Sequence, residues 1–107
     1  MSGLSSRRKG TRSELELVHA YRAAGYTAAR VPNSGGLDTK GDITGVPGVH
    51  VEAKRCERLP LWAALTQAEH QAPAGDMPAL HFRRNRTGWH VAIPLDDFIA
   101  LLQARDL

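Results

Sequence analysis

The sequence has 107 residues, and its 14 lysines and arginines outnumber its 11 aspartates and glutamates, which gives a formal net charge of +3. This length allows one modest hydrophobic core in one domain, and the single cysteine, Cys56, excludes an intrachain disulfide and indicates a reducing, cytoplasmic setting. No apolar run approaches the roughly 20 residues that span a bilayer, so we expect neither a membrane partner nor a signal peptide.

The first predicted element is a helix from Ser13 to about Ala24, because serine is a favourable N-cap and Gly25 can end a helix. Glu14 falls in the middle of its apolar stripe, whereas Glu16 points to the opposite side. A carboxylate on a core-facing stripe is costly unless a metal, a cation or hydrogen bonds compensate it. The alternative is a first-turn glutamate that is favoured by the helix dipole. The stripe consists of Leu17, Val18, Tyr21 and Ala24.

Two basic clusters stand apart from each other in the chain. The first cluster leads into the predicted helix, and we expect a flexible basic N-terminal arm over residues 1–11, followed by a single domain over residues 12–107. Separated basic clusters are typical of proteins that bind a phosphate backbone, although solvated basic patches are also common. The two clusters are Arg7, Arg8, Lys9 and Arg12, and Arg83, Arg84 and Arg86.

The middle of the chain is predicted to contain short strands joined by a polar loop. "YTAARV" (residues 26–31) has the composition of a strand, and "PNSGGLDTKG" (residues 32–41) that of a glycine-rich loop. "GDITGVPGVHVEAK" (residues 41–54) is predicted to form a β-hairpin that turns at residues 46–48. The second strand of this hairpin carries the charged residues discussed below.

The last third of the chain adds two helices and two strands. Helical spacing of apolar residues predicts helices at residues 59–72 and 95–104, and strands are predicted at residues 78–84 and 88–94. The predicted order is therefore α-β-β-β-α-β-β-α, an α/β fold in which helices flank a central mixed sheet.

Alternation along the hairpin strand places Glu52 and Lys54 on the same face. Hydrolysis of a phosphodiester requires a divalent cation held by carboxylates, an activated water and a positive charge near the reacting phosphate. Asp42 and Glu52 could hold a hard metal through oxygen, with Lys54 facing the same phosphate. The spacing D-x9-E-x-K is only moderately specific, so its context matters.

That context is supplied by five motifs, of which the first sets a Lys-Gly pair ahead of Glu14. They are "RKGTRSELELV", "ARVPNSGG", "GDITG", "VEAK" and "LHFRRNRTGWHVAIP". Together they resemble the PD-(D/E)XK nucleases, and within these the archaeal-type Holliday junction resolvases and the short phage-encoded nucleases similar to them. The resemblance extends over roughly residues 7–103 and implies the restriction-endonuclease-like fold.

The resemblance implies a role for each matching residue. Glu14, Asp42 and Glu52 would be metal-binding catalytic carboxylates for Mg²⁺, with Mn²⁺ as a substitute. Lys54 would position water or stabilise transition-state charge. The DNA-binding residues would be Ser34, as a phosphate contact, Arg30, near the site, and the two basic clusters Arg7, Arg8, Lys9, Arg12, Arg83, Arg84 and Arg86.

Some assignments stay open at this stage. The family's motif often has a proline before the aspartate, where this chain has Gly41, and Asp38 is an alternative to Asp42 as the metal ligand. His50 shares the face of Glu52 and is either near the metal or an ordinary strand residue. The roles of Gln67 and Gln71 are also open: they either support the E-x-K strand or lie on a solvated flank of the helix.

The resemblance implies a Mg²⁺-dependent endodeoxyribonuclease that resolves four-way DNA junctions by paired nicks, within recombination and repair. Two symmetric nicks indicate a C2 homodimer. No small-molecule cofactor is expected, and a phage-encoded enzyme would act in the host cytoplasm. One alternative is a less structure-specific phage or repair nuclease of the same fold. The other is a non-cleaving DNA-binding accessory protein of recombination, which the intact set of carboxylates disfavours, because they repel a phosphate.

Overall fold

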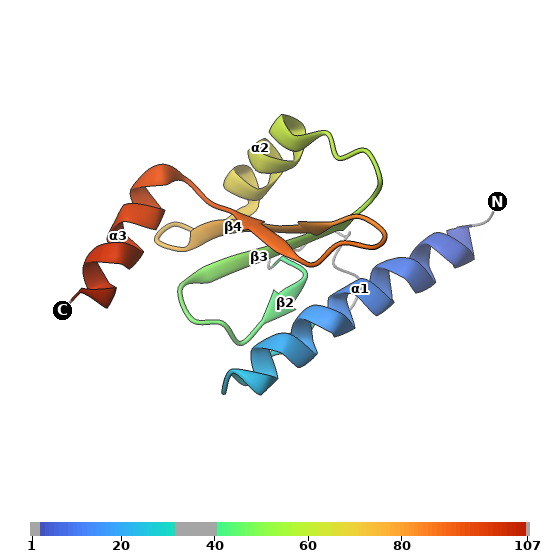
Figure 1. Ribbon diagram of the computed structural model, residues 1–107, viewed down its shortest axis with the longest axis horizontal. Helices are drawn as coiled ribbons and strands as arrows, with labels where there is room; N and C mark the ends of the chain where they lie inside the picture. Colours follow the sequence, from blue (N-terminus) through green and yellow to red (C-terminus); the bar gives the residue numbers. More distant parts are fainter. Residues whose placement is uncertain (1–2, 32–40, 107) are drawn as a thin grey trace.

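The computed structural model describes residues 3–31 and 41–106, with the backbone alone for residues 3–9. The elements follow the predicted order α-β-β-β-α-β-β-α (Figure 1). They are α1 (Gly3–Ala23), β1 (Ala29–Arg30), β2 (Ile43–Thr44), β3 (Val49–Arg55), α2 (Leu61–Gln71), β4 (Met77–Arg83), β5 (His90–Ala92) and α3 (Leu95–Arg105).

The five strands form one mixed sheet in the order β1-β2-β3-β4-β5. Strands β3 and β4 are parallel and joined through α2, whereas the other three pairs are antiparallel. The predicted α/β fold with a mixed sheet is confirmed. Strand β3 is central, with β2 on one side and β4 on the other, so residues on it are held from both edges. Glu52 pairs with Leu80 of β4, and Lys54 pairs with Phe82.

Helices α1 and α2 cover opposite faces of this sheet (Figure 1). The main core lies between α1 and strands β2 and β3, where Leu17 and Val18 pack against Ile43 and Val51. On the other face, α2 contacts β4 and β3 and buries Ala64 and Ala68, whose small side chains allow a close approach. Strand β3, which carries the predicted catalytic residues Glu52 and Lys54, thus lies between the layer of α1 and the layer of α2.

Helix α1 begins much earlier than predicted. Residues 3–11, expected to form an arm without secondary structure, are helical and continuous with the rest of α1. Ser13 is therefore not an N-cap but a buried residue inside the helix. The physical reason is cooperativity, because extending an existing helix costs far less than starting one. The division into an arm at 1–11 and a domain at 12–107 stays a prediction.

Other boundaries are close to those expected. The strand predicted at residues 26–31 is shorter, at Ala29–Arg30, and the loop predicted at residues 32–41 lies almost entirely outside the described residues. Ser34 and Asp38 are in that part of the chain. Among the residues that the structure describes, no helix is both long and apolar enough to cross a membrane.

A buried polar contact ties α1 to the sheet across its core. The hydroxyl of Tyr21 donates to Nε2 of His81 on β4, while Nδ1 of His81 donates to the carbonyl of Ala79, 3.0 Å away. Burial lowers the pKa of His81, so the neutral ring is favoured in the folded protein. This contact fixes the helix that carries Glu14 relative to β4.

Candidate active site

Asp42 is held by the backbone of the central strand. Its amide donates to the carbonyl of Val51 at 2.9 Å, and its side-chain Oδ2 accepts a hydrogen bond from the amide of Ala53 at 2.7 Å. Its own carbonyl accepts from the amide of Val31, 3.0 Å away. The carboxylate is thereby fixed beside β3, one residue before β2 begins.

The glycine before Asp42 has a structural reason. Gly41 has φ of +80°, and a Cβ at this position would lie 2.8 Å from the carbonyl oxygen of Val51 and 3.2 Å from the ring of His50. Proline fixes φ near about −65° and could not adopt this conformation. Glycine stands in place of the family's usual proline because the backbone at this position has a positive φ and passes close to Val51 and His50.

Glu52 is a buried carboxylate on β3, with 5% of the residue exposed. Its Oε1 lies 2.8 Å from Nε2 of His50, also buried, and the ring donates because an ionised carboxylate can only accept. Burial raises the pKa of Glu52, and the nearby charge of Asp42 raises it further, while the hydrogen bond from His50 lowers it. His50, one of the open assignments, is thus a direct partner of Glu52.

Glu14 approaches the same place from α1. Its Oε1 accepts a hydrogen bond from Nε of Arg30 at 2.7 Å. Burial raises the pKa of Glu14, and Asp42 raises it further through charge repulsion and a side-chain hydrogen bond, whereas Arg30 lowers it. Neighbouring carboxyl groups whose charges repel each other favour a shared proton or a bound cation. Arg30 supplies part of the positive charge that this acidic cluster requires.

The structure therefore brings together the predicted carboxylates Glu14, Asp42 and Glu52, with Asp42 acting electrostatically on both others. Lys54 lies close enough to Glu52 to lower its pKa. Within residues 10–31 and 41–106, no three Asp, Glu, His or Cys side chains form a ready-made metal cage. Mg²⁺ fits such a site, because it retains several waters and is bound by one or two carboxylates together with substrate phosphate.

The predicted DNA-binding residues fall into different environments. Arg12, Arg84 and Arg86 are exposed, Arg30 is paired with Glu14, and Ser34 lies outside the described residues. Of the first basic cluster, Arg7, Arg8 and Lys9 belong to α1, and their side chains are not described. Gln67 is exposed and Gln71 half-buried on α2.

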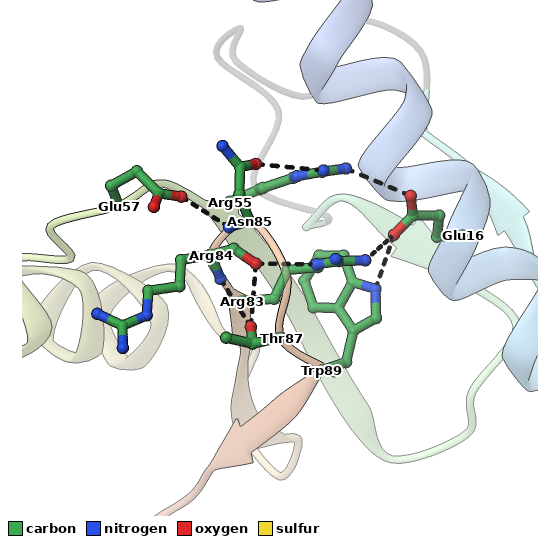
Figure 2. Close-up of polar contacts among 8 residues, drawn as sticks. All are labelled: Glu16, Arg55, Glu57, Arg83, Arg84, Asn85, Thr87 and Trp89. Atoms are coloured by element: carbon green, nitrogen blue, oxygen red, sulfur yellow. Dashed lines mark hydrogen bonds and ion pairs between the residues drawn. The ribbon is translucent and has the colours of Figure 1, made fainter.

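Arg83 differs from its basic neighbours, because only 18% of its side chain is exposed and its Nη1 donates to Glu16 at 3.0 Å. Glu16, expected on the solvent side of α1, instead accepts hydrogen bonds from three segments of the chain (Figure 2). The partners lie 39 to 73 residues away in sequence, so no local pattern could have predicted them.

A mixed five-stranded sheet between helices, with acidic residues converging beside its central strand, defines the nuclease class implied by the motifs. The model of the family described as "Phage putative PDDEXK endonuclease" matches residues 5–106, and the chain belongs to this family. The resemblance to PD-(D/E)XK nucleases is therefore confirmed.

Among solved structures, the chain is similar to Hjc of Archaeoglobus fulgidus, a Holliday junction resolvase from an archaeal hyperthermophile. The two are 26% identical with a TM-score of 0.61, and the match covers 79% of this chain and 72% of that chain. A comparison with curated proteins gives no significant match. Family and fold together identify the chain as a nuclease.

Proposed function

We propose that this nuclease is a divalent-metal-dependent endodeoxyribonuclease with Glu14, Asp42, Glu52 and Lys54 as its catalytic residues. The observation that carries the proposal is the convergence of three carboxylates, two of them with raised pKa values, beside the central strand. Such mutual repulsion is costly in the free protein and is relieved by a cation. When bound, Mg²⁺ or Mn²⁺ would polarise the scissile phosphate and make water more acidic.

The residues of the site have separate proposed roles in metal binding, in orienting the ligands and in stabilising charge. Asp42 and Glu52 would hold the metal ion, and the amide of Ala53 and the ring of His50 keep their carboxylates oriented. Glu14 completes the acidic set from α1. Lys54, which follows Glu52 on the same face, would stabilise the negative charge that develops on the phosphate. Arg30 is placed to contact DNA once its pairing with Glu14 loosens.

The proposed substrate is branched DNA, and in particular the four-way junction. Support comes from the similarity to an archaeal Holliday junction resolvase. One gel that compares a junction, a linear duplex and a single strand, with and without Mg²⁺, tests this proposal. We expect Mg²⁺-dependent nicks in the junction alone. Equal cleavage of the duplex would favour a less specific nuclease, and binding without cleavage would favour an accessory protein.

The exposed basic side chains of the β4–β5 connection are expected to contact DNA phosphates. Each lost phosphate contact should reduce the slope of log affinity against log salt by about 0.9 on duplex DNA. Changing Arg84 and Arg86 to alanine should therefore weaken junction binding and flatten this slope, while cleavage at saturating enzyme survives better than affinity. Binding isotherms at several salt concentrations measure the effect, and a slope equal to that of the wild type would show that these residues do not touch DNA.

A homodimer is proposed because two symmetric nicks require two active sites. Helix α3 supports the proposal, since it buries none of its residues and its central part, "FIALLQA", is uncharged on every side. Exposed apolar residues gathered on one helix commonly mark a contact surface. The exposed apolar residues are Leu95, Phe98, Ile99 and Leu101.

Phe98→Glu is expected to convert the dimer into a monomer, because a carboxylate would be buried in the apolar centre of the interface. Trp62→Glu is the matched control: Trp62 is more exposed than Phe98, at 79% against 48%, but lies on α2. Light scattering coupled to size-exclusion chromatography gives the mass of each variant. A monomeric wild type, or a dimeric Phe98→Glu variant, would exclude α3 as the interface.

A further inference from the structure

We infer that Glu16 is a positioning residue that fixes the β4–β5 turn (residues 84–88), and with it the direction in which Arg84 and Arg86 meet DNA. The inference rests on the proposed DNA-cleaving function and extends it to a residue outside the metal site. Glu16 is two residues from Glu14 on α1, but its contacts are with the far ends of β3 and β4.

Glu16 receives hydrogen bonds from three separate segments (Figure 2). Its Oε1 accepts from Nη1 of Arg83 and from Nε1 of Trp89, both at 3.0 Å. Its Oε2 accepts from Nη1 of Arg55 at 3.3 Å. Arg55 ends β3, Arg83 ends β4 and Trp89 precedes β5, so one carboxylate joins both ends of the turn to the strand that carries Glu52.

The turn itself is held by further contacts. Asn85 accepts from Nη2 of Arg55 at 3.3 Å through its side chain, and its amide donates to Glu57 at 2.6 Å. Thr87 accepts from the amide of Arg84 at 3.1 Å and donates to the carbonyl of the same residue at 3.0 Å. These bonds fix the backbone of the turn on both sides (Figure 2).

The backbone conformation of Arg86 is one that the rest of the turn must hold in place. Arg86 has φ of +66° and is the one non-glycine residue with positive φ in the part of the chain that the structure describes. Residues with side chains rarely adopt this region, and they do so where the surrounding structure compels them, often at functional sites. The hydrogen bonds of Asn85 and Thr87, on either side of Arg86, hold it in this conformation.

The cations of this region divide into two kinds. Arg55 and Arg83 are 18% exposed and committed to Glu16. The side chains of Arg84 and Arg86 are exposed and make no hydrogen bond or ion pair with residues 10–31 or 41–106. The guanidinium of Arg84 points away from the contacts around Glu16 (Figure 2). A fixed turn holds the backbone of these two residues in place, so that only their side chains remain to be ordered when DNA binds.

Glu16→Gln tests the inference, because charge and positioning predict opposite results. Removing a negative charge from a DNA-binding surface should tighten binding if only net charge matters. If Glu16 positions the turn, the variant should instead bind the junction about tenfold more weakly. Its amide oxygen can still accept from Arg83 and Trp89, but its NH2 group cannot accept from Arg55, so the link through Glu16 between the turn and β3 is lost and ordering the turn then opposes binding. Cleavage at saturating DNA should stay near wild type. The matched control is Glu69→Gln on α2, an exposed glutamate away from the turn that loses the same charge.

A second variant, with its control, tests another contact of the turn and changes only exposed residues. Glu57→Ala removes the acceptor for the amide of Asn85, and Glu69→Ala makes the same change elsewhere. Both residues are exposed, so both variants should fold. We expect weaker junction binding for Glu57→Ala and unchanged or tighter binding for Glu69→Ala. If Glu16→Gln does not fold, this pair still shows whether fixing the β4–β5 turn determines the affinity for DNA.

The salt dependence separates positioning from lost contacts. The Glu16 and Glu57 variants should keep the wild-type salt slope, because Arg84 and Arg86 still reach phosphates, whereas removing these arginines flattens it. Wild-type affinity in folded Glu16→Gln and Glu57→Ala would overturn the inference, as would a lower saturating rate at unchanged affinity. If the wild type itself binds no DNA, the proposed function fails instead.

Discussion

Replacing Glu52 with glutamine is expected to abolish DNA cleavage and, at the same time, to raise the thermal stability of the metal-free protein. Glutamine has the shape of glutamate and can still accept the hydrogen bond from His50, but it is a poor ligand for Mg²⁺. Loss of several kcal/mol of Lewis-acid stabilisation lowers the rate by about a thousandfold or more. A gel with four-way junctions measures the loss.

The gain in stability follows from the direction of the pKa shifts. Burial raises the pKa of Glu52 in the folded protein, as it does that of Glu14. The folded state therefore binds protons more tightly than the unfolded state, so stability falls as pH rises from the unfolded pKa through the folded one. At neutral pH the ionised Glu52 is a penalty, which glutamine removes.

Thermal melts without metal, from about pH 4 to about pH 8, check this expectation. The wild type should lose stability over the range above the ordinary glutamate pKa, and Glu52→Gln should lose less. Mg²⁺ should stabilise the wild type and have little effect on the variant. A folded Glu52→Gln protein that cleaves normally would contradict the site assignment, and one that is destabilised without metal would contradict the penalty argument.

Asp42→Asn is the second change for which we expect a loss of activity of about a thousandfold or more. An asparagine oxygen can still accept from the amide of Ala53, so the entry to β2 should keep its structure. The negative charge beside Glu14 and Glu52 is lost, which should lower the raised pKa values of both. Cleavage assays and metal-free melts at several pH values give the two results together.

Asp38→Asn is the control, because Asp38 is the alternative ligand in the sequence and lies outside the described residues. We expect this variant to cleave nearly as well as the wild type, since the backbone contacts of Asp42 already fix one carboxylate beside β3. If Asp38→Asn is inactive and Asp42→Asn is active, the assignment of the aspartate motif must shift to Asp38.

The order of the elements could be predicted from the sequence, as could the faces on which the charged residues of β3 and α1 lie. Alternation along "VHVEAK" put Glu52 and Lys54 on one face, and helical spacing put Glu14 on the packed stripe of α1. Both patterns depend only on the period of the local backbone, which is why they could be predicted. The start of α1 could not, because the gain from extending a helix over residues 3–11 is not visible as a cap or an apolar stripe.

The partners of these side chains could not be predicted, because they depend on how the helices pack on the sheet. Arg30 reaches Glu14, His50 contacts Glu52, and Glu16, expected in solvent, binds Arg55, Arg83 and Trp89. With the exception of His50 and Glu52, these pairs are far apart in sequence, and their meeting depends on strand order and on how α1 crosses the sheet. Local periodicity fixes the face on which a side chain lies, whereas packing between layers fixes what that side chain meets there.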